Sequence, residues 1–482
     1  MTDMTGQEET KAKEAAAATS GRPADAVAGK SAQVLADAVA GKSAQVRVDA
    51  VAGDGAAKDS GVSRRTIFGV TGVAVGAAAV ASAGGFAVGR ATAPTVTTAS
   101  YEFRGSHQSG IVTSQQDRMH FAAYDVTTSS RDELIALLRR WSQAAATLMA
   151  GSEIGAGAAG GNYAAPPDDT GEALDLPASK LTITFGFGPT LFEKDGTDRF
   201  GIASMRPEQL IDLPKFAGDT LDPKFVGGDL CIQACADDPT VAVHAIRNLS
   251  RIAFGAAAIK WSQLGFGRTS STTSDQVTPR NFMGFKDGTH NLRAEETALI
   301  NKWLWSEPAD GEAWMAGGSY LVARRIRILA EIWDRTSLSE QEALVGRTKG
   351  SGAPLSGGKE FTPTDFDRAG NNGEPLVAPD SHIAIAHPDH NAGSMMLRRG
   401  YNFTDGADDL GRLDAGLFFL AYVRDPRTQF VPIQERMSSA DIMTVEYLRT
   451  TGSALFAVPP GIPLGAALGG TDGAFIGQSL FA

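Results

Sequence analysis

The chain has 482 residues, of which 43% are hydrophobic and 21% are charged. This length and composition are ordinary for a soluble globular protein with two or three domains and a sizeable core. The formal net charge of −11 argues against nucleic acid as a partner, because a protein that binds nucleic acid normally needs a concentrated basic face.

We expect residues 1–62 to be a disordered leader. Residues 1–60 contain no aromatic residue, and the string DAVAGKSAQV occurs at residues 25–34 and again at 37–46, which gives a twelve-residue repeat. A repeat with so few large apolar groups cannot offset the entropy that is lost on folding. A short amphipathic helix, which the alanine content allows, is the alternative.

A twin-arginine export signal is predicted over residues 63–93. The string SRRTIFG at residues 63–69 places two arginines ahead of an uncharged stretch rich in Gly, Ala and Val that runs to residue 89. Such signals export proteins that fold and bind cofactors before crossing the membrane, so we expect a secreted or extracytoplasmic protein that meets the twin-arginine translocase. A permanent membrane anchor is the alternative, which the length allows and the weak hydrophobicity disfavours.

The remaining chain alternates strand-like runs with amphipathic helices. MHFAAYDV (119–126) and LTITFGFG (181–188) alternate as strands do, and between them apolar residues recur at helical spacing from Arg131 onward. A double glycine followed by a strand, a turn and a helix occurs twice, from residue 227 and from residue 317. Later strands are predicted at residues 382–387, 395–403 and 416–425.

The two comparable halves predict an α+β protein with antiparallel sheets, each covered by helices on one face. We place an N-terminal domain at residues 98–300 and a C-terminal domain at residues 301–482. Residues 357–372 are polar and rich in turn residues, so we expect a long surface loop there.

The two cysteines, Cys231 and Cys235, are not expected to form a disulfide with each other. On the predicted strand they are four steps apart, roughly 13 Å, which exceeds the limit of roughly 7 Å between the α-carbons of a disulfide. On a helix they would come within reach, so the conclusion depends on the strand.

Residues that suggest chemistry occur at three places. The polar segment 265–291 contains GFKDG, whose aspartate is Asp287, and His382 begins a predicted strand. Arg398 and Arg399 follow on the next predicted strand, where neighbouring residues face opposite sides, so at most one of them enters a given pocket. Each feature alone has an ordinary explanation, because Asp-Gly marks tight turns and histidines and arginines are commonly hydrogen-bonded or ion-paired.

Several long strings together resemble the DyP-type (dye-decolourising) peroxidase family. In chain order they are TPRNFMGFKDGTHN, GSYLVARRIRI with EIWDRTSLSEQEALVGRTKGSGAP, DSHIAIAHP with MLRRGYNF, and GLFFLAYVRDP. The resemblance covers nearly all of residues 101–461 and is closest to the branch that carries twin-arginine signals and includes deferrochelatase-like peroxidases. It implies two ferredoxin-like domains arranged like a dimeric α+β barrel, with one haem b per chain between sheet and helices.

The resemblance also implies roles for individual residues. His382 of DSHI matches the proximal ligand of the haem iron, Asp287 matches the distal aspartate, and Arg398 of LRRGYNF matches the distal arginine. On the predicted strand His387 faces away from His382, which supports His382 as the ligand. Further contacts with the haem are expected from Gly288, Thr289, Leu417 and Phe419, and with its propionates from Arg324 and Arg325.

The activity implied is reduction of hydrogen peroxide with oxidation of dyes, phenolics or other one-electron donors through a ferryl intermediate. The alternative is a deferrochelatase-like protein that carries haem or releases its iron. A third hypothesis is an interaction module that uses this fold without haem. The sequence leaves open whether the chain forms a homo-oligomer.

Overall fold

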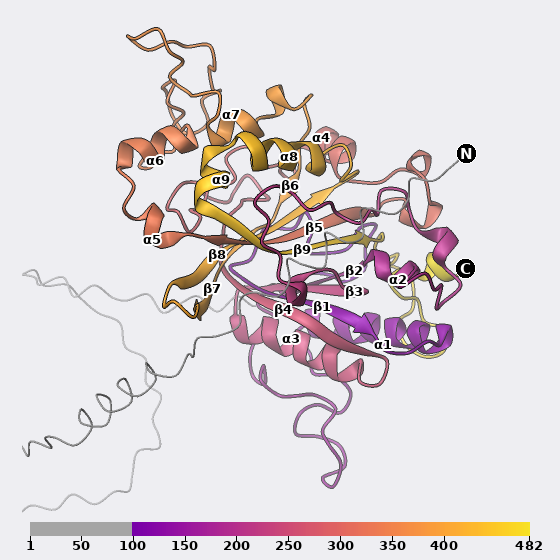
Figure 1. Cartoon of the computed structure of the whole chain (residues 1–482). Coiled ribbons are helices and arrows are strands. Elements are labelled where there is room, and N and C mark those ends of the chain that lie inside the picture. The colour runs from indigo at the N-terminus through magenta and orange to yellow at the C-terminus, as the bar shows by residue number, and fades with distance from the viewer. Residues whose placement is uncertain (1–98) are drawn as a thin grey trace, which may run out of the picture. The chain divides into compact units, whose positions relative to one another are not determined.

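The strands of the described chain form one antiparallel sheet that closes into a barrel (Figure 1). The computed structural model describes residues 99–482, so the predicted leader (1–62) and the predicted signal (63–93) lie outside the described residues. The nine strands of the described chain are β1 (Arg118–Val126), β2 (Thr182–Phe187), β3 (Leu230–Ala236), β4 (Ala257–Arg268), β5 (Ser319–Ile328), β6 (Leu397–Arg398), β7 (Tyr401–Ala407), β8 (Leu413–Val423) and β9 (Leu448–Val458).

Helices cover the outside of the barrel, and local sequence explains where the longest begin. α1 begins after Ser130, whose side chain accepts a hydrogen bond from the backbone N–H of Glu133, and α3 begins with Pro239 after the cap Asp238. Both residue types are favoured at helix starts, where backbone donors lack partners. The α-helices are α1 (Arg131–Met149), α2 (Pro189–Phe192), α3 (Pro239–Ile252), α4 (Thr297–Trp303), α5 (Ala330–Trp333), α6 (Leu338–Val345), α7 (His382–Ala386), α8 (Phe430–Ala440) and α9 (Ile442–Tyr447).

The barrel consists of two similar halves. The strands of the first half lie in the order β2–β3–β1–β4, and those of the second half in the order β7–β8–β5–β9. Each order is that of a ferredoxin-like β-α-β-β-α-β unit. β4 pairs with β7 and β2 pairs with β9, so the two sheets close on each other. The predicted fold, two ferredoxin-like units joined as an α+β barrel, is confirmed.

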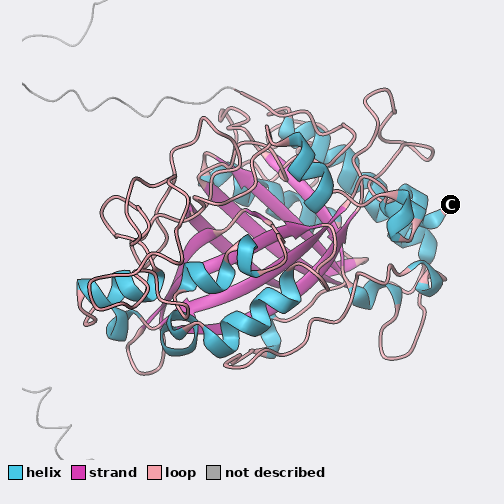
Figure 2. Ribbon diagram, turned by 90° about the horizontal axis from the view of Figure 1, so that it is seen from above, coloured by secondary structure: helices cyan, strands magenta, loops and turns pink. Residues whose placement is uncertain are grey.

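Alternating side chains give the sheet one hydrophobic core inside the barrel and another beneath the helices. On β1, Phe121 lies inside the barrel, with its ring 5.3 Å from that of Phe418 in the other half. Tyr124 points outward and packs against Trp141 of α1 at a ring distance of 5.2 Å. Figure 2 shows the strands in the middle of the described chain with helices around them. In the second half, the outward face is covered by α7, α8 and α9 (Figure 1).

The structure corrects two predicted strands. The segment that begins at His382 is the helix α7, and His387 is the C-cap residue of this helix. The argument that His387 faces away from His382 on a strand is therefore wrong. A short apolar run does not distinguish a strand from a helix, which explains the error. The predicted strand 395–403 is two strands, β6 and β7, separated at Gly400, where a Cβ would lie 2.7 Å from the side-chain oxygen of Thr269.

The predictions for the two cysteines and for residues 357–372 are confirmed. Cys231 and Cys235 lie on β3 and are both free and buried. Residues 357–372 form an irregular segment that is largely exposed. Within residues 99–482, no helix combines the length and the apolar character that crossing a membrane requires.

Candidate active site

A cavity of about 580 Å³ lies between the strands of the second half of the barrel and the helices that cover them. Strands β5, β8 and β9 form one wall, and helices α7, α8 and α9 form the opposite wall. Further lining comes from residues between 281 and 290, from residues 217–220 in a loop of the first half, and from the segments that carry Arg347 and Arg398. Cavities of roughly 300–1,000 Å³ with mostly apolar walls are typical of cofactor and small-molecule sites. The apolar lining includes Ile326, Ile328, Leu417, Phe419, Ile433 and Leu448.

His382, the first residue of α7, faces this cavity. Its Nδ1 lies 2.7 Å from Oδ2 of Asp441, a fully buried carboxylate that also accepts a hydrogen bond from Thr444. Nδ1 therefore carries the proton that it donates to Asp441, and the lone pair is left on Nε2. No other described residue hydrogen-bonds this Nε2, and 29% of the side chain is exposed although it lies deep in the molecule. The imidazole thus offers a free nitrogen to whatever fills the cavity.

The charge of Asp441 also changes the acidity of His382. Burial alone lowers the pKa of His382, but the attraction and the hydrogen bond of Asp441 outweigh burial, so the pKa lies above its ordinary value. Asp287 adds to this increase, and Arg398 opposes it. Both residues therefore act on the same imidazole, although they lie about a hundred residues apart in the chain.

Asp287 and Arg398 form an ion pair on the cavity wall. Arg398, at the end of β6, donates from Nη1 to Oδ1 of Asp287 over 2.8 Å. Asn281 donates to the second oxygen of the same carboxylate at 3.3 Å. Both members of the pair keep part of their surface exposed, 15% for Asp287 and 27% for Arg398, so a small molecule in the cavity can reach them.

Glycine fixes the loop that presents Asp287. Gly284 and Gly288 have φ values of +86° and +90°, a left-handed conformation that side chains disfavour. A Cβ at Gly288 would also lie 2.9 Å from the α-carbon of Ser270. The two glycines of GFKDG are therefore needed for backbone geometry, and they leave the aspartate between them facing the cavity.

Most of the other predicted contact residues line the same cavity. Gly288 and Thr289 do so from the loop after Asp287, and Leu417 and Phe419 do so from β8. Arg399 is fully buried and donates to the backbone oxygen of Thr113, away from the cavity. The expectation that only one of the two neighbouring arginines enters the pocket is confirmed.

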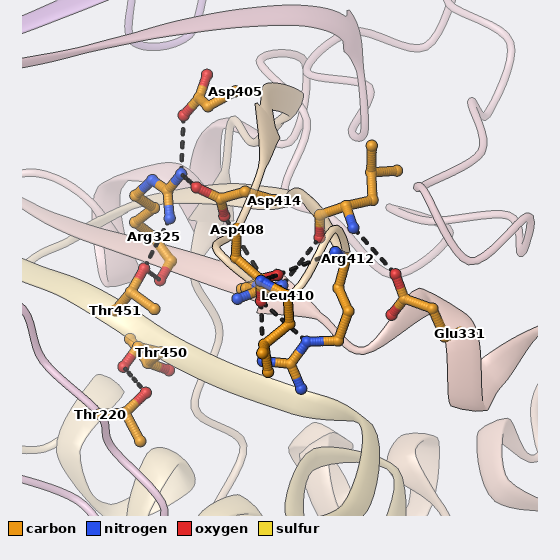
Figure 3. Close-up of polar contacts among 12 residues, drawn as sticks. Thr220, Arg325, Glu331, Asp405, Asp408, Leu410, Arg412, Asp414, Thr450 and Thr451 are labelled. Carbon is orange, nitrogen blue, oxygen red and sulfur yellow. Dashed lines mark hydrogen bonds and ion pairs between the residues drawn. The ribbon is translucent and has the colours of Figure 1, made fainter. Parts of the chain in front are cut away.

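The prediction that Arg324 and Arg325 contact the propionates is corrected, because the described structure places neither residue on the cavity wall. Arg324 is 1% exposed and forms a buried ion pair of 2.5 Å with Asp219, which lines the cavity whereas Arg324 does not. Arg325 points to the other side of β5. It donates to Asp405, Asp414 and Thr451 (Figure 3). Both arginines therefore already have partners within the protein.

Two donor groups that line the cavity, Arg347 and His387, were not assigned to the cofactor from the sequence. Arg347 is 5% exposed, and its Nη1 donates to the backbone oxygens of Gly352 and Glu360. His387 accepts a hydrogen bond at Nδ1 from the backbone of Asp389, so its proton is on Nε2. That Nε2 is buried and has no acceptor within residues 99–482. Arg347 stands in the quoted string GRTKGSGAP, so the family resemblance contained the signal.

Comparison with known proteins finds matches along most of the chain. The model of the N-terminal part of Dyp-type peroxidases matches residues 108–267, and that of the C-terminal part matches residues 278–463. The chain belongs to the DyP-type peroxidase family. The predicted family is confirmed, and the division into domains near residue 300 stays a prediction.

Relatives and solved structures cover most of this DyP-type chain. The dye-decolorizing peroxidase of Thermobifida fusca is 38% identical over 358 residues, 73% of this chain and 76% of the relative. The deferrochelatase of Escherichia coli K12 is 35% identical over 365 residues, 75% of this chain and 84% of the relative. The structure of ferric DtpA from Streptomyces lividans is 38% identical, with a TM-score of 0.71 and coverage of 80% of this chain and 98% of that one.

The DyP-type family is one of haem-binding oxidoreductases, and this chain is a haem peroxidase, as the sequence predicts. The cavity with His382, Asp287 and Arg398 is therefore the candidate active site.

Proposed function

We propose that this DyP-type peroxidase binds one haem b per chain in the cavity, where His382 would supply the protein's ligand to the iron. We further propose that Asp287 and Arg398 act on hydrogen peroxide, and that dyes, phenolics or similar one-electron donors are the reductants. One observation carries the proposal: the free Nε2 of His382 and the Asp287–Arg398 pair face one cavity from separate elements.

The lining fits an iron porphyrin. A porphyrin brings four nitrogen ligands to its iron, so the protein needs to add only one, and His382 offers one unpaired nitrogen. Within residues 99–482, no group of three or more His, Cys, Asp or Glu residues could hold a bare metal ion. Apolar side chains from β5, β8 and β9 suit the faces of the ring.

Donors without acceptors fit the carboxylates of the same group. Haem b carries two propionates, and buried donors are normally satisfied by an acceptor. His387 has a buried Nε2–H without one, and the guanidinium of Arg347 has only backbone acceptors for its Nη1. We assign these two residues, in place of Arg324 and Arg325, to the propionates.

When bound, the haem would supply the redox chemistry that links reduction of peroxide to oxidation of the donors. Asp287 accepts the proton from one oxygen of hydrogen peroxide and returns it to the departing oxygen, which leaves as water. Arg398 stabilises the negative charge that develops as the O–O bond breaks. Asp441 keeps the imidazole of His382 in one orientation and one tautomer.

The name of the Escherichia coli relative suggests release of iron from haem as a second function. The Asp287–Arg398 pair favours the peroxidase. A protein that only carries haem has no need for an acid–base group and a guanidinium beside the cofactor, whereas cleavage of peroxide needs both.

We also propose export by the twin-arginine translocase, with a secreted or extracytoplasmic location. The support is the string SRRTIFG followed by an uncharged stretch. Replacing both arginines, Arg64 and Arg65, by lysine should retain the protein inside the cell, and cell fractionation with an antibody would show this. Unchanged export of the double variant would contradict the proposal.

The decisive experiment is an absorption spectrum before and after one equivalent of hydrogen peroxide. Wild type should show a Soret band that peroxide changes, and His382→Ala should lose the wild-type band and its response. His390→Ala is the matched control, because His390 lies nearby but does not line the cavity. A wild-type spectrum and response in His382→Ala would place the axial ligand elsewhere and refute the proposal.

A further inference from the structure

Arg398 lies on a strand that has a neighbouring strand on only one side. β6 contains two residues, and its partner in the sheet is β8, where Arg398 stands opposite Ala421. On the other side of β6, the side chain of Asn291 makes the hydrogen bonds to the backbone that a neighbouring strand would make. Its Oδ1 accepts from the backbone N–H of Arg398 at 2.7 Å, and its Nδ2 donates to the backbone oxygen of Arg398 at 2.9 Å. Asn291 therefore satisfies both backbone groups of Arg398.

The backbone of Asn291 is also hydrogen-bonded to the loop that carries Asp287. The backbone N–H of Asn291 donates to the oxygen of Gly288 at 3.0 Å and so closes a turn directly after Asp287. The second hydrogen of Nδ2 donates to the backbone oxygen of Ser271 at 3.0 Å. Asn291 is 4% exposed, so these bonds are made where water cannot replace them. Two short connections thus join Asp287 to Arg398 through one residue.

We infer that Asn291 is a positioning residue that fixes Arg398 relative to Asp287, an inference that rests on the proposed function. Asn291 is not part of the cavity wall in the described structure, so it acts through Arg398 and does not touch peroxide. A primary amide is required because it offers a donor and an acceptor together. An aspartate keeps the shape and the acceptor but turns an oxygen toward two backbone oxygens.

The inference predicts a selective kinetic defect. A displacement of about 1 Å in a catalytic group can reduce a rate about a hundredfold. The reaction with hydrogen peroxide needs Asp287 and Arg398 at the correct positions relative to each other, whereas the later oxidation of an organic donor does not. Loss of the Asn291 amide should therefore slow the peroxide step and leave the donor step and haem loading as they are.

The test compares Asn291→Asp and Asn291→Ala with the matched control Asn248→Asp. Asn248 is buried on α3, far from the cavity lining, and its amide likewise accepts from one backbone N–H, of Thr170, and donates to one backbone oxygen, of His244. Stopped-flow absorbance gives the rate constants for peroxide and for the donor. Cyanide titration of the ferric protein gives a second readout that requires no turnover, because the bound anion is sensitive to Arg398.

We expect the peroxide rate constant to fall at least about tenfold in both Asn291 variants, and cyanide binding to weaken in parallel. Asn248→Asp should match wild type in both measurements. In an Arg398→Ala background the Asn291 substitutions should have less than about a twofold further effect, because the residue that they position is gone.

Three outcomes would overturn the inference. The first is a peroxide rate within about twofold of wild type in folded, haem-loaded Asn291 variants. The second is an equal loss with and without Arg398, which would mean that Asn291 acts independently. The third is failure of both variants to fold or to load haem, which would give Asn291 a purely structural role. Normal peroxide turnover of Arg398→Ala alone would instead reject the proposed role of Arg398, which is the part of the proposed function on which the inference rests.

Discussion

Asp441 holds the Nδ1 of His382 at 2.7 Å with a carboxylate that is fully buried and shared with Thr444. The second oxygen of Asp441 has no hydrogen-bond partner within residues 99–482. A buried carboxylate with so few partners draws strongly on the Nδ1 proton. The imidazole that faces the cavity is therefore electron-rich, which suits a ligand that must stabilise an oxidised iron.

Asp441→Asn should weaken this effect while it keeps the shape of the side chain. We expect a higher iron reduction potential and a loss of activity of about 10–100-fold, the range typical of groups that orient a metal ligand. Potentiometric titration followed at the Soret band measures the first, and peroxide kinetics measure the second. Asp212→Asn, at an exposed carboxylate that pairs with Arg206 away from the cavity lining, is the control. An unchanged potential in Asp441→Asn would contradict the argument.

Arg398→Ala should slow the reaction with peroxide about 100- to 1,000-fold, because it removes a charged donor from the place where negative charge develops. The rate of Arg398→Lys should lie between the rates of this variant and wild type, since an ammonium group is more strongly hydrated and less rigid than a guanidinium. Stopped-flow mixing with peroxide measures both. Arg424→Ala is the control, because Arg424 pairs with Asp310 away from the cavity lining. Near-normal turnover of Arg398→Ala would contradict the role proposed for Arg398 in cleaving peroxide.

The sequence predicted the three central residues because they stand in strings that resemble the DyP-type peroxidase family, whereas each of them alone has an ordinary explanation. The two glycines of GFKDG fix the turn around Asp287, and the alternation of a strand separates Arg398 from Arg399. Both rules are local, and the structure bears them out. The strand predicted at His382 failed because a five-residue apolar run fits a helix equally well.

The errors and omissions concern partners that are distant in the chain. Arg324 was expected at the cofactor because nothing in the sequence shows that Asp219, 105 residues earlier, pairs with it. Likewise, the free donor on His387 becomes visible only when the acceptors around it are known. Contacts of this kind depend on how the two halves close, which no local pattern reports.

The corrected role of Arg324 predicts a loss of stability where the sequence predicted a loss of cofactor. Asp219→Ala should destabilise the fold by about 3–5 kcal/mol, because it leaves a buried guanidinium uncompensated. Calorimetry should show a midpoint of thermal unfolding several degrees lower than that of wild type. Haem titration at a temperature where the variant is folded should show a near-normal affinity for haem. Replacing both residues, Arg324→Met with Asp219→Leu, should recover much of the loss. A selective loss of haem affinity in Arg324→Met would restore the original assignment.

His120 on β1 should make stability depend on pH. Burial lowers the pKa of His120 to about 4 in the folded chain, whereas an unfolded histidine has a pKa of about 6.5. Between these values the unfolded chain binds more protons, so stability is complete above about pH 6.5 and decreases as the pH falls toward 4. The contribution is at most about 3 kcal/mol.

His120→Gln removes the titrating group, so its stability should fall less than that of wild type over the same pH range. Chemical denaturation of both proteins at pH 7 and at pH 4.5 measures the difference, which should shift in favour of the variant as the pH is lowered. A difference that stays constant between the two pH values would show that His120 is protonated equally in the folded and the unfolded chain.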